Sequence, residues 1–105
     1  MVSGGSTVLE KKIEEAVCQY AKDKGLLVYK FTSPNRAAVP DRLFILPDGR
    51  FFFIEFKATG KKPTAPQERE HLRLRGHKVS VYVIDDVGFG KFVIDAHVNE
   101  MARGR

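Results

Sequence analysis

The feature that most constrains the fold is a Pro-Asp-Gly turn at residues 47–49, between two apolar segments. The segments are DRLFIL, residues 41–46, and RFFFIEFK, residues 50–57, and both are rich in residues that favour strands. A three-residue loop of this kind fits a type I turn with glycine in the left-handed position. We therefore predict a β-hairpin in which Leu46 lies opposite Arg50, with the pairing continuing outward residue by residue.

That register brings charged residues together at one end of the hairpin. Counting outward places Asp41 opposite Glu55, and Lys57 follows one pleat further on the same face. Two carboxylates this close repel each other unless a cation or a proton lies between them. Mg²⁺ binds through one or two carboxylates and water, and a bound divalent ion can activate water at a phosphodiester. A neighbouring lysine can orient that water or neutralise developing charge.

Two alternatives to this metal site stay open. A two-residue turn, Asp48-Gly49, would slip the pairing by one residue and move Asp41 to the opposite face. Glu55 and Lys57 could also form an ordinary ion pair at a strand end, with Asp41 in a loop. The hairpin register, the preceding proline and the apolar surroundings favour the site.

Two predicted helices each begin with a capping box that contains a candidate site residue. In the helix over residues 6–25, Glu10 lies at the edge of the apolar stripe, but it also closes a capping box with Thr7. In the helix over 64–76, Gln67 holds the same position relative to Thr64. For both Glu10 and Gln67, a structural role in the helix cap and a functional role in the site stay open. The expected stripe of the first helix is Leu9, Ile13, Ala16, Val17 and Tyr20.

The order of elements predicts an α/β fold. Further strands are expected at residues 26–31 and 78–84, and the tail, 85–105, is expected to be helical at its later end. The predicted order is α-β-β-β-α-β-α, a mixed sheet flanked by helices. With 105 residues the chain suits a single domain, here 7–105 after a flexible leader, 1–6. Residues 89–101 offer apolar surface for an interface.

Composition narrows the class of partner. The chain has 18 Lys and Arg against 13 Asp and Glu, a net charge of +5 that favours a polyanion without requiring one. No apolar run is long enough for a membrane helix, and no signal peptide is recognisable. A single cysteine, Cys18, is expected off the apolar stripe and unreactive; it suits a reducing compartment, so we expect a cytoplasmic protein, in host cytoplasm if viral. His71, His77 and His97 show no metal-binding spacing and are interpreted as surface or ligand-facing residues.

The ordered set of motifs resembles a known family. Pro40-Asp41, Glu55-x-Lys57 across a hairpin, Glu10 on the first helix and Gln67 opening the second are similar to the VRR-NUC domain, the virus-type replication and repair nucleases of the PD-(D/E)xK superfamily. The resemblance is to the stand-alone viral and bacterial type and runs from Glu10 to about residue 84. It implies a restriction-endonuclease-like core.

The resemblance also implies roles for these residues. Asp41, Glu55 and the Phe56 backbone carbonyl would bind Mg²⁺ or Mn²⁺. Glu10 would complete the acidic site, directly or through water. Lys57 would position the nucleophilic water, and Gln67 would support the site from the second helix. By its resemblance to the stand-alone members, the chain is expected to form a homodimer that cuts branched DNA such as four-way junctions. No small-molecule cofactor is expected. Flap or duplex DNA, or a non-catalytic nucleic-acid-binding module, are the alternatives. Expected phosphate contacts are Lys30, Arg36, Arg42, Lys61, Lys62, Arg69, Arg73 and Arg75.

Overall fold

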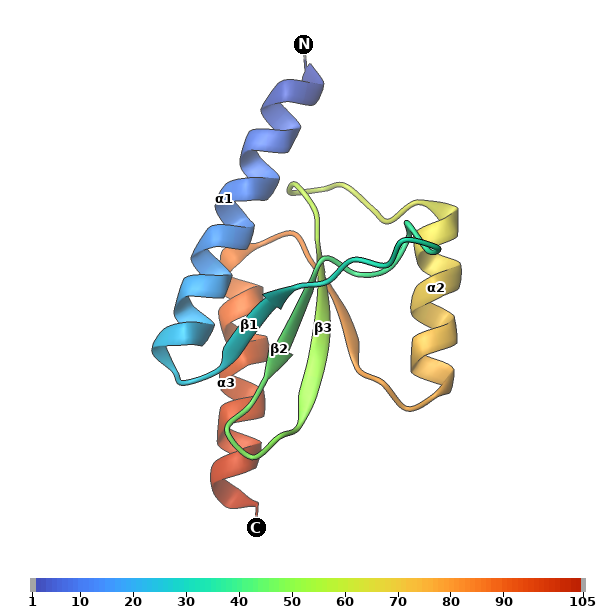
Figure 1. Ribbon diagram of the computed structural model, residues 1–105. Helices are drawn as coiled ribbons and strands as arrows, with labels where there is room; N and C mark the ends of the chain where they lie inside the picture. The colour runs from blue at the N-terminus through green and yellow to red at the C-terminus, as the bar shows by residue number, and fades with distance from the viewer. Residues whose placement is uncertain (1, 105) are drawn as a thin grey trace.

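The computed structural model describes the backbone of residues 2–104 and the side chains of residues 9–104. The elements follow the predicted order (Figure 1). They are α1 (Val2–Asp23), β1 (Leu27–Lys30), β2 (Arg42–Ile45), β3 (Phe51–Phe56), α2 (Ala65–Gly76), β4 (Val81–Ile84) and α3 (Val87–Arg103). The α/β class and the mixed sheet are therefore confirmed.

The four strands form one sheet in the order β1-β2-β3-β4. The β2–β3 hairpin has the predicted register, since Phe44 pairs with Phe52 and Arg42 with Ile54. Gly49 has φ 93° and donates its N–H to the carbonyl of Leu46 at 2.8 Å, as the three-residue turn requires. β1 pairs antiparallel with β2, whereas β4 runs parallel to β3 after the α2 crossover.

Helices cover the sheet unequally. α1 and α3 pack together on one face of the sheet (Figure 1). On that face Phe52, Ile54 and Phe56 of β3 are fully buried with side chains of both helices. α2 lies on the opposite face, beside β3 and β4. The alternate residues of β3, including Glu55, point to this second face. At the hairpin end that carries Asp41 and Glu55, the Glu55 side chain therefore faces α2.

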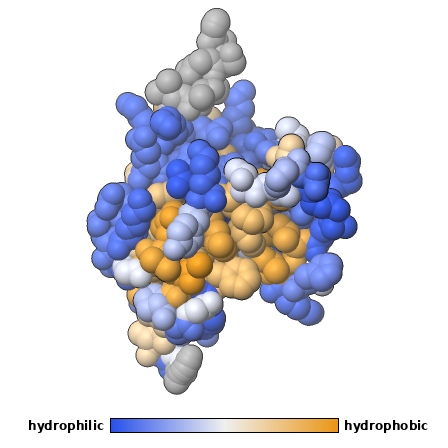
Figure 2. All heavy atoms as spheres, viewed as in Figure 1, coloured by the Kyte–Doolittle hydropathy of each residue, from blue (hydrophilic) through white to orange (hydrophobic). Residues whose placement is uncertain are grey.

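The face shared with α2 remains partly exposed over β1 and β2. Leu27 and Tyr29 on β1 are 55% and 52% exposed, and Phe51 on β3 is 49% exposed. Figure 2 shows the corresponding apolar area on the front of the molecule, bordered by polar side chains. This surface was not anticipated from the sequence, because the strand pattern alone does not show how far a helix extends over the sheet.

Three details of the helices differ from expectation. The backbone of α1 is helical from Val2, so it begins before Thr7; a capping box favours a helix start without requiring one. The side chain of Thr7 lies outside the described residues, and the division into a leader, 1–6, and a domain stays a prediction. Leu9 is exposed, whereas Cys18 is buried in the core, so the apolar stripe is rotated toward Cys18 and Ala21.

α3 begins earlier in the tail than expected, at Val87, despite two glycines in its first turn. Asp86 is its N-cap and accepts a hydrogen bond from Phe89 N–H at 2.8 Å. A Cβ at Gly90 would lie 2.5 Å from a methyl of Val17, so glycine permits the close approach of α1 and α3. Within the described chain, no helix has the length and apolar character needed to cross a membrane.

Candidate active site

Asp41 and Glu55 meet where the β2–β3 hairpin opens. Asp41 precedes β2, and its Oδ2 atom accepts a hydrogen bond from the Phe56 backbone N–H at 2.8 Å. This bond holds the Asp41 side chain against the end of β3. Glu55 extends from β3 on the same face and is only 2% exposed. The structure thus brings together the two carboxylates that the register predicted.

Lys57 and Gln67 both approach one oxygen of Glu55. The Lys57 Nζ atom lies 3.5 Å from Oε2 of Glu55, and the Gln67 Nε2 atom donates to the same oxygen at 3.1 Å. Gln67 also completes the capping box of α2, because its Oε1 accepts from the Thr64 N–H at 2.9 Å. One end of the Gln67 amide therefore caps α2 and the other contacts Glu55, and a functional role for Gln67 stays a prediction.

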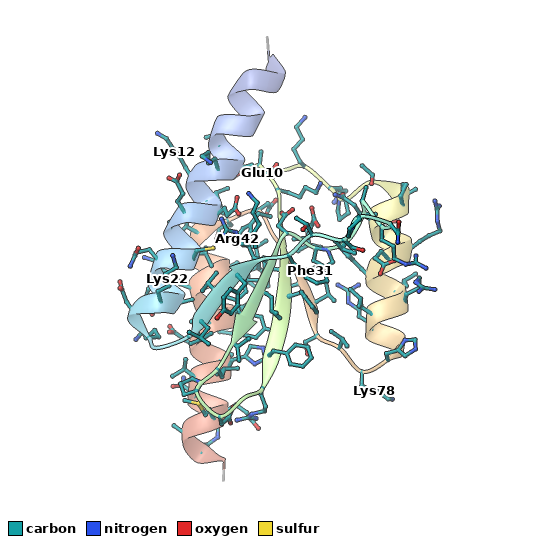
Figure 3. The ribbon with its side chains drawn as sticks, viewed as in Figure 1. Glu10, Lys12, Lys22, Phe31, Arg42 and Lys78 are labelled. Atoms are coloured by element: carbon teal, nitrogen blue, oxygen red, sulfur yellow. The ribbon has the colours of Figure 1, made fainter. Side chains whose placement is uncertain are left out.

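Glu10 and Asp41 line a cleft of about 400 Å³ between α1 and the loop after β1. Figure 3 shows Glu10 on the side of α1 toward the strand ends, whereas Lys12 points away. Burial and the charge of Asp41 raise the pKa of Glu10. Glu10 therefore lies near enough to the two carboxylates to share their electrostatic environment. The cleft also contains Lys30 and Arg36, two of the expected phosphate contacts.

The surroundings of Asp41 and Glu55 disfavour the ionised form of both side chains. Burial, followed by the charge of Asp41, raises the pKa of Glu55 to about 7. Burial also raises the pKa of Asp41, although the Phe56 N–H works in the opposite direction. Lys57 offsets only part of this effect at Glu55. A bound cation would relieve the remaining repulsion.

The donor set fits a hard divalent cation. Among the side chains from residue 9 onward, no group of three or more Asp, Glu, His or Cys forms a ready-made cage. In that same part of the chain, Oε1 of Glu55 is buried without a hydrogen-bond partner. The Phe56 carbonyl projects toward the same side as its N–H, which contacts Asp41. Two carboxylates and a carbonyl, with water for the remaining positions, suit Mg²⁺ or Mn²⁺.

The predicted basic residues surround the site, but several are held by acidic partners. Arg42 forms an ion pair with Glu14 of α1, at 2.5 Å between Nε and Oε2. Arg36 and Arg73 both contact Oε1 of Glu70, at 3.4 and 3.3 Å. Their contacts to DNA stay predictions. Lys61, Lys62 and Arg75 line a second cavity of about 510 Å³, which α2 and β4 also border. Arg36, Arg69 and Arg73 line a third, of about 290 Å³.

His71 lies beside Glu55, which sequence reasoning did not predict. It was expected at the surface or toward a ligand, yet it is 1% exposed and its Nε2 lies 3.7 Å from Oε1 of Glu55. Burial lowers the pKa of His71. Its spacing of four residues from Gln67 was the available signal, because residues i and i+4 share a helix face. Cys18 is packed in the hydrophobic core, and burial raises the pKa of its thiol to about 11.

The chain is similar over most of its length to a phage protein and to a solved structure. It is 45% identical over 82 residues to "Putative nuclease p44" of Acyrthosiphon pisum secondary endosymbiont phage 1, covering 76% of this chain and 88% of the phage protein. A solved structure described as "VRR_NUC domain" superposes with a TM-score of 0.77 at 31% identity, covering 82% of this chain and 94% of the solved chain. No family model matches the chain.

Proposed function

The chain belongs to the VRR-NUC family of nucleases, and from that premise we propose that it is a metal-dependent endodeoxyribonuclease that cuts branched DNA. The observation that carries the proposal is the pairing of Asp41 with Glu55, whose buried carboxylate has a pKa raised to about 7. A protein that only binds DNA gains nothing from two carboxylates beside the phosphates, since like charges repel.

Each residue of the site has a defined task in this proposal. Asp41, Glu55 and the Phe56 carbonyl hold Mg²⁺ or Mn²⁺, and Glu10 contributes directly or through water. When bound, the ion polarises the phosphodiester and lowers the pKa of a coordinated water. Lys57, whose ammonium lies 3.5 Å from Glu55, orients the attacking water and stabilises charge on the phosphate.

The basic residues beside the site supply contacts to the DNA backbone. Lys30 and Arg36 line the cleft next to Asp41, and Lys61 and Lys62 line the cavity bordered by α2 and β4. Such contacts fix the position of a strand without reading its sequence. This arrangement supports a preference for DNA shape, and we propose four-way junctions as the substrate, engaged by a homodimer.

The decisive experiment compares labelled four-way junction, splayed arm, flap and linear duplex, each with Mg²⁺, with Mn²⁺ and with EDTA. We expect nicking of the branched substrates that is abolished by EDTA. Asp41→Asn and Lys57→Met should each reduce the cleavage rate by at least about 10³-fold, because they remove a metal ligand and the ammonium group. Arg103→Gln, an exposed change at the end of α3, is the matched control and should retain wild-type activity.

The possible outcomes separate the functional alternatives. Metal-dependent cleavage of linear duplex at the same rate as junctions would keep the nuclease and reject the preference for branched DNA. Binding of DNA in EDTA with no cleavage of any substrate would reject the enzyme and leave a nucleic-acid-binding module. Full activity in both site variants, with folding checked by circular dichroism, would also contradict the proposal.

A further inference from the structure

A buried histidine faces the second oxygen of Glu55. His71 lies one helical turn after Gln67 on α2 and is 1% exposed. Its Nε2 atom is 3.7 Å from Oε1 of Glu55. Within the described part of the chain, these two atoms alone are buried side-chain polar atoms without a hydrogen-bond partner. Unsatisfied polar atoms are costly in a protein interior, so two of them facing each other call for an explanation.

The two carboxylate oxygens of Glu55 differ in their polar contacts. Oε2 receives the Gln67 amide at 3.1 Å and lies 3.5 Å from the Lys57 ammonium. Among the described side chains, Oε1 has no hydrogen-bond partner, and the nearest approach to it is that of the His71 imidazole, at 3.7 Å. A hydrogen bond would form if the two atoms approached to about 3 Å, a shift of under 1 Å.

We propose that His71 is a positioning residue, which donates a hydrogen bond from Nε2–H to Oε1 of Glu55 when that carboxylate is ionised and holds a divalent cation. This inference rests on the proposed function, because it takes Glu55 to be a metal ligand. α2 then holds the carboxylate through both oxygens, with Gln67 on one and His71 on the other. The two hydrogen bonds would restrict the carboxylate to a single orientation.

Direct measurement of Mn²⁺ binding tests this role independently of cleavage. Outer partners of metal ligands are worth 10–100-fold in metal affinity, so His71→Leu should raise the Mn²⁺ dissociation constant by about that factor. His71→Gln, which keeps a donor, should recover most of the affinity. The control is His77→Gln, because His77 is exposed and its ring Nδ1 lies 2.9 Å from the Arg73 carbonyl oxygen. Isothermal titration and the Mn²⁺ spin-resonance signal give two independent readings.

The stability of the metal-free protein separates positioning from packing. Leucine replaces a buried, unpaired imidazole, so the metal-free His71→Leu variant should be at least as stable as wild type in urea denaturation. Should it fail to fold, His71→Phe fills the same space without a donor. Equal Mn²⁺ affinity in wild type and His71→Leu, or equal weakening in His71→Leu and His71→Gln, would overturn the inference. Failure of the wild-type protein to bind Mn²⁺ would instead contradict the proposed function as well.

Discussion

Glu55 is a residue whose position opposes its own ionisation. It occupies a strand between two fully buried neighbours, Ile54 and Phe56, yet it carries a carboxylate that is 2% exposed. The contacts from Gln67 and Lys57 compensate one oxygen only. Burial and Asp41 together raise the pKa of Glu55 to about 7. In the metal-free protein the residue is therefore a source of instability at neutral and alkaline pH.

The pH dependence of stability tests this description. Glu55 binds a proton more tightly when folded, pKa about 7, than when unfolded, near 4.5. Its contribution to stability is therefore full below about pH 4.5 and is lost as the pH rises through about 7. Glu55→Gln cannot ionise, so in urea denaturation without metal it should be more stable than wild type by about 1–3 kcal/mol at pH 8 and nearly equal at pH 4. A difference that shrinks as the pH rises would contradict the assignment.

At the scale of the elements, α2 serves the site through its first turn. The Gln67 amide caps the helix with one atom and contacts Glu55 with the other. The orientation of the helix start and that of the carboxylate are therefore coupled. A variant that loses only the helix cap, or only the contact with Glu55, should therefore change stability and activity separately.

Variants of the capping box measure that separation. Thr64→Ala removes the hydroxyl that accepts from the Gln67 N–H, and it should cost about 1 kcal/mol in unfolding free energy with little change in cleavage. Gln67→Glu keeps an acceptor for the cap but places a third carboxylate against Glu55, so cleavage at pH 7 should fall by about tenfold or more. Urea denaturation and single-turnover cleavage provide the two readings. Equal loss of activity in both variants would mean that Gln67 acts only through the helix.

The packing of α1 on α3 depends on the absence of a side chain at Gly90. An added Cβ would lie 2.5 Å from Val17 and 3.2 Å from Ile84, and the β-branched Val17 has little freedom to move away. Gly90→Ala should therefore destabilise the protein by about 1–3 kcal/mol, although alanine favours helices. Gly76→Ala is the matched control, because a Cβ there meets nothing within 4 Å of the described structure. Greater stability of Gly90→Ala in thermal denaturation would contradict this packing.

Sequence reasoning succeeded where local chemistry determines geometry. The Pro-Asp-Gly turn sets the hairpin register, and the register alone places Asp41 opposite Glu55. It failed where position depends on packing between distant elements. Cys18 proved to be a core residue, because the rotation of α1 is set by α3 and the sheet. The burial of His71 depends on how α2 docks, which a helix with weak apolar periodicity does not reveal.

At the scale of the whole molecule, two apolar surfaces are available for a second copy of the chain. One is the sequence-predicted surface on α3, where Phe89 and Phe92 are 46% and 66% exposed and their rings lie 6.4 Å apart. The other is the partly exposed sheet face around Tyr29. Large exposed aromatic side chains are more common at interfaces than on isolated surfaces.

A dimer that uses α3 predicts a specific dissociation. The wild-type protein should have the mass of a dimer at micromolar concentration in chromatography with light scattering, and Phe92→Glu should have the mass of a monomer, because it buries a charge in the interface. Tyr29→Glu should leave a dimer through α3 intact. A monomeric Tyr29→Glu with a dimeric Phe92→Glu would assign the interface to the sheet face, and a monomeric wild type would contradict the proposed homodimer.

The site is assembled from residues far apart along the chain. Glu10 comes from α1, Asp41 from the residue before β2, and Glu55 from β3. Gln67 comes from the crossover helix α2, and the Lys57 N–H donates to the Ile84 carbonyl at the end of β4. Contacts of this separation form slowly during folding, because long loops must close first. The hairpin emerging from a ribosome therefore holds its acidic pair without the last strand that secures it. The complete arrangement of the site should therefore form only after α2 and β4 have both docked.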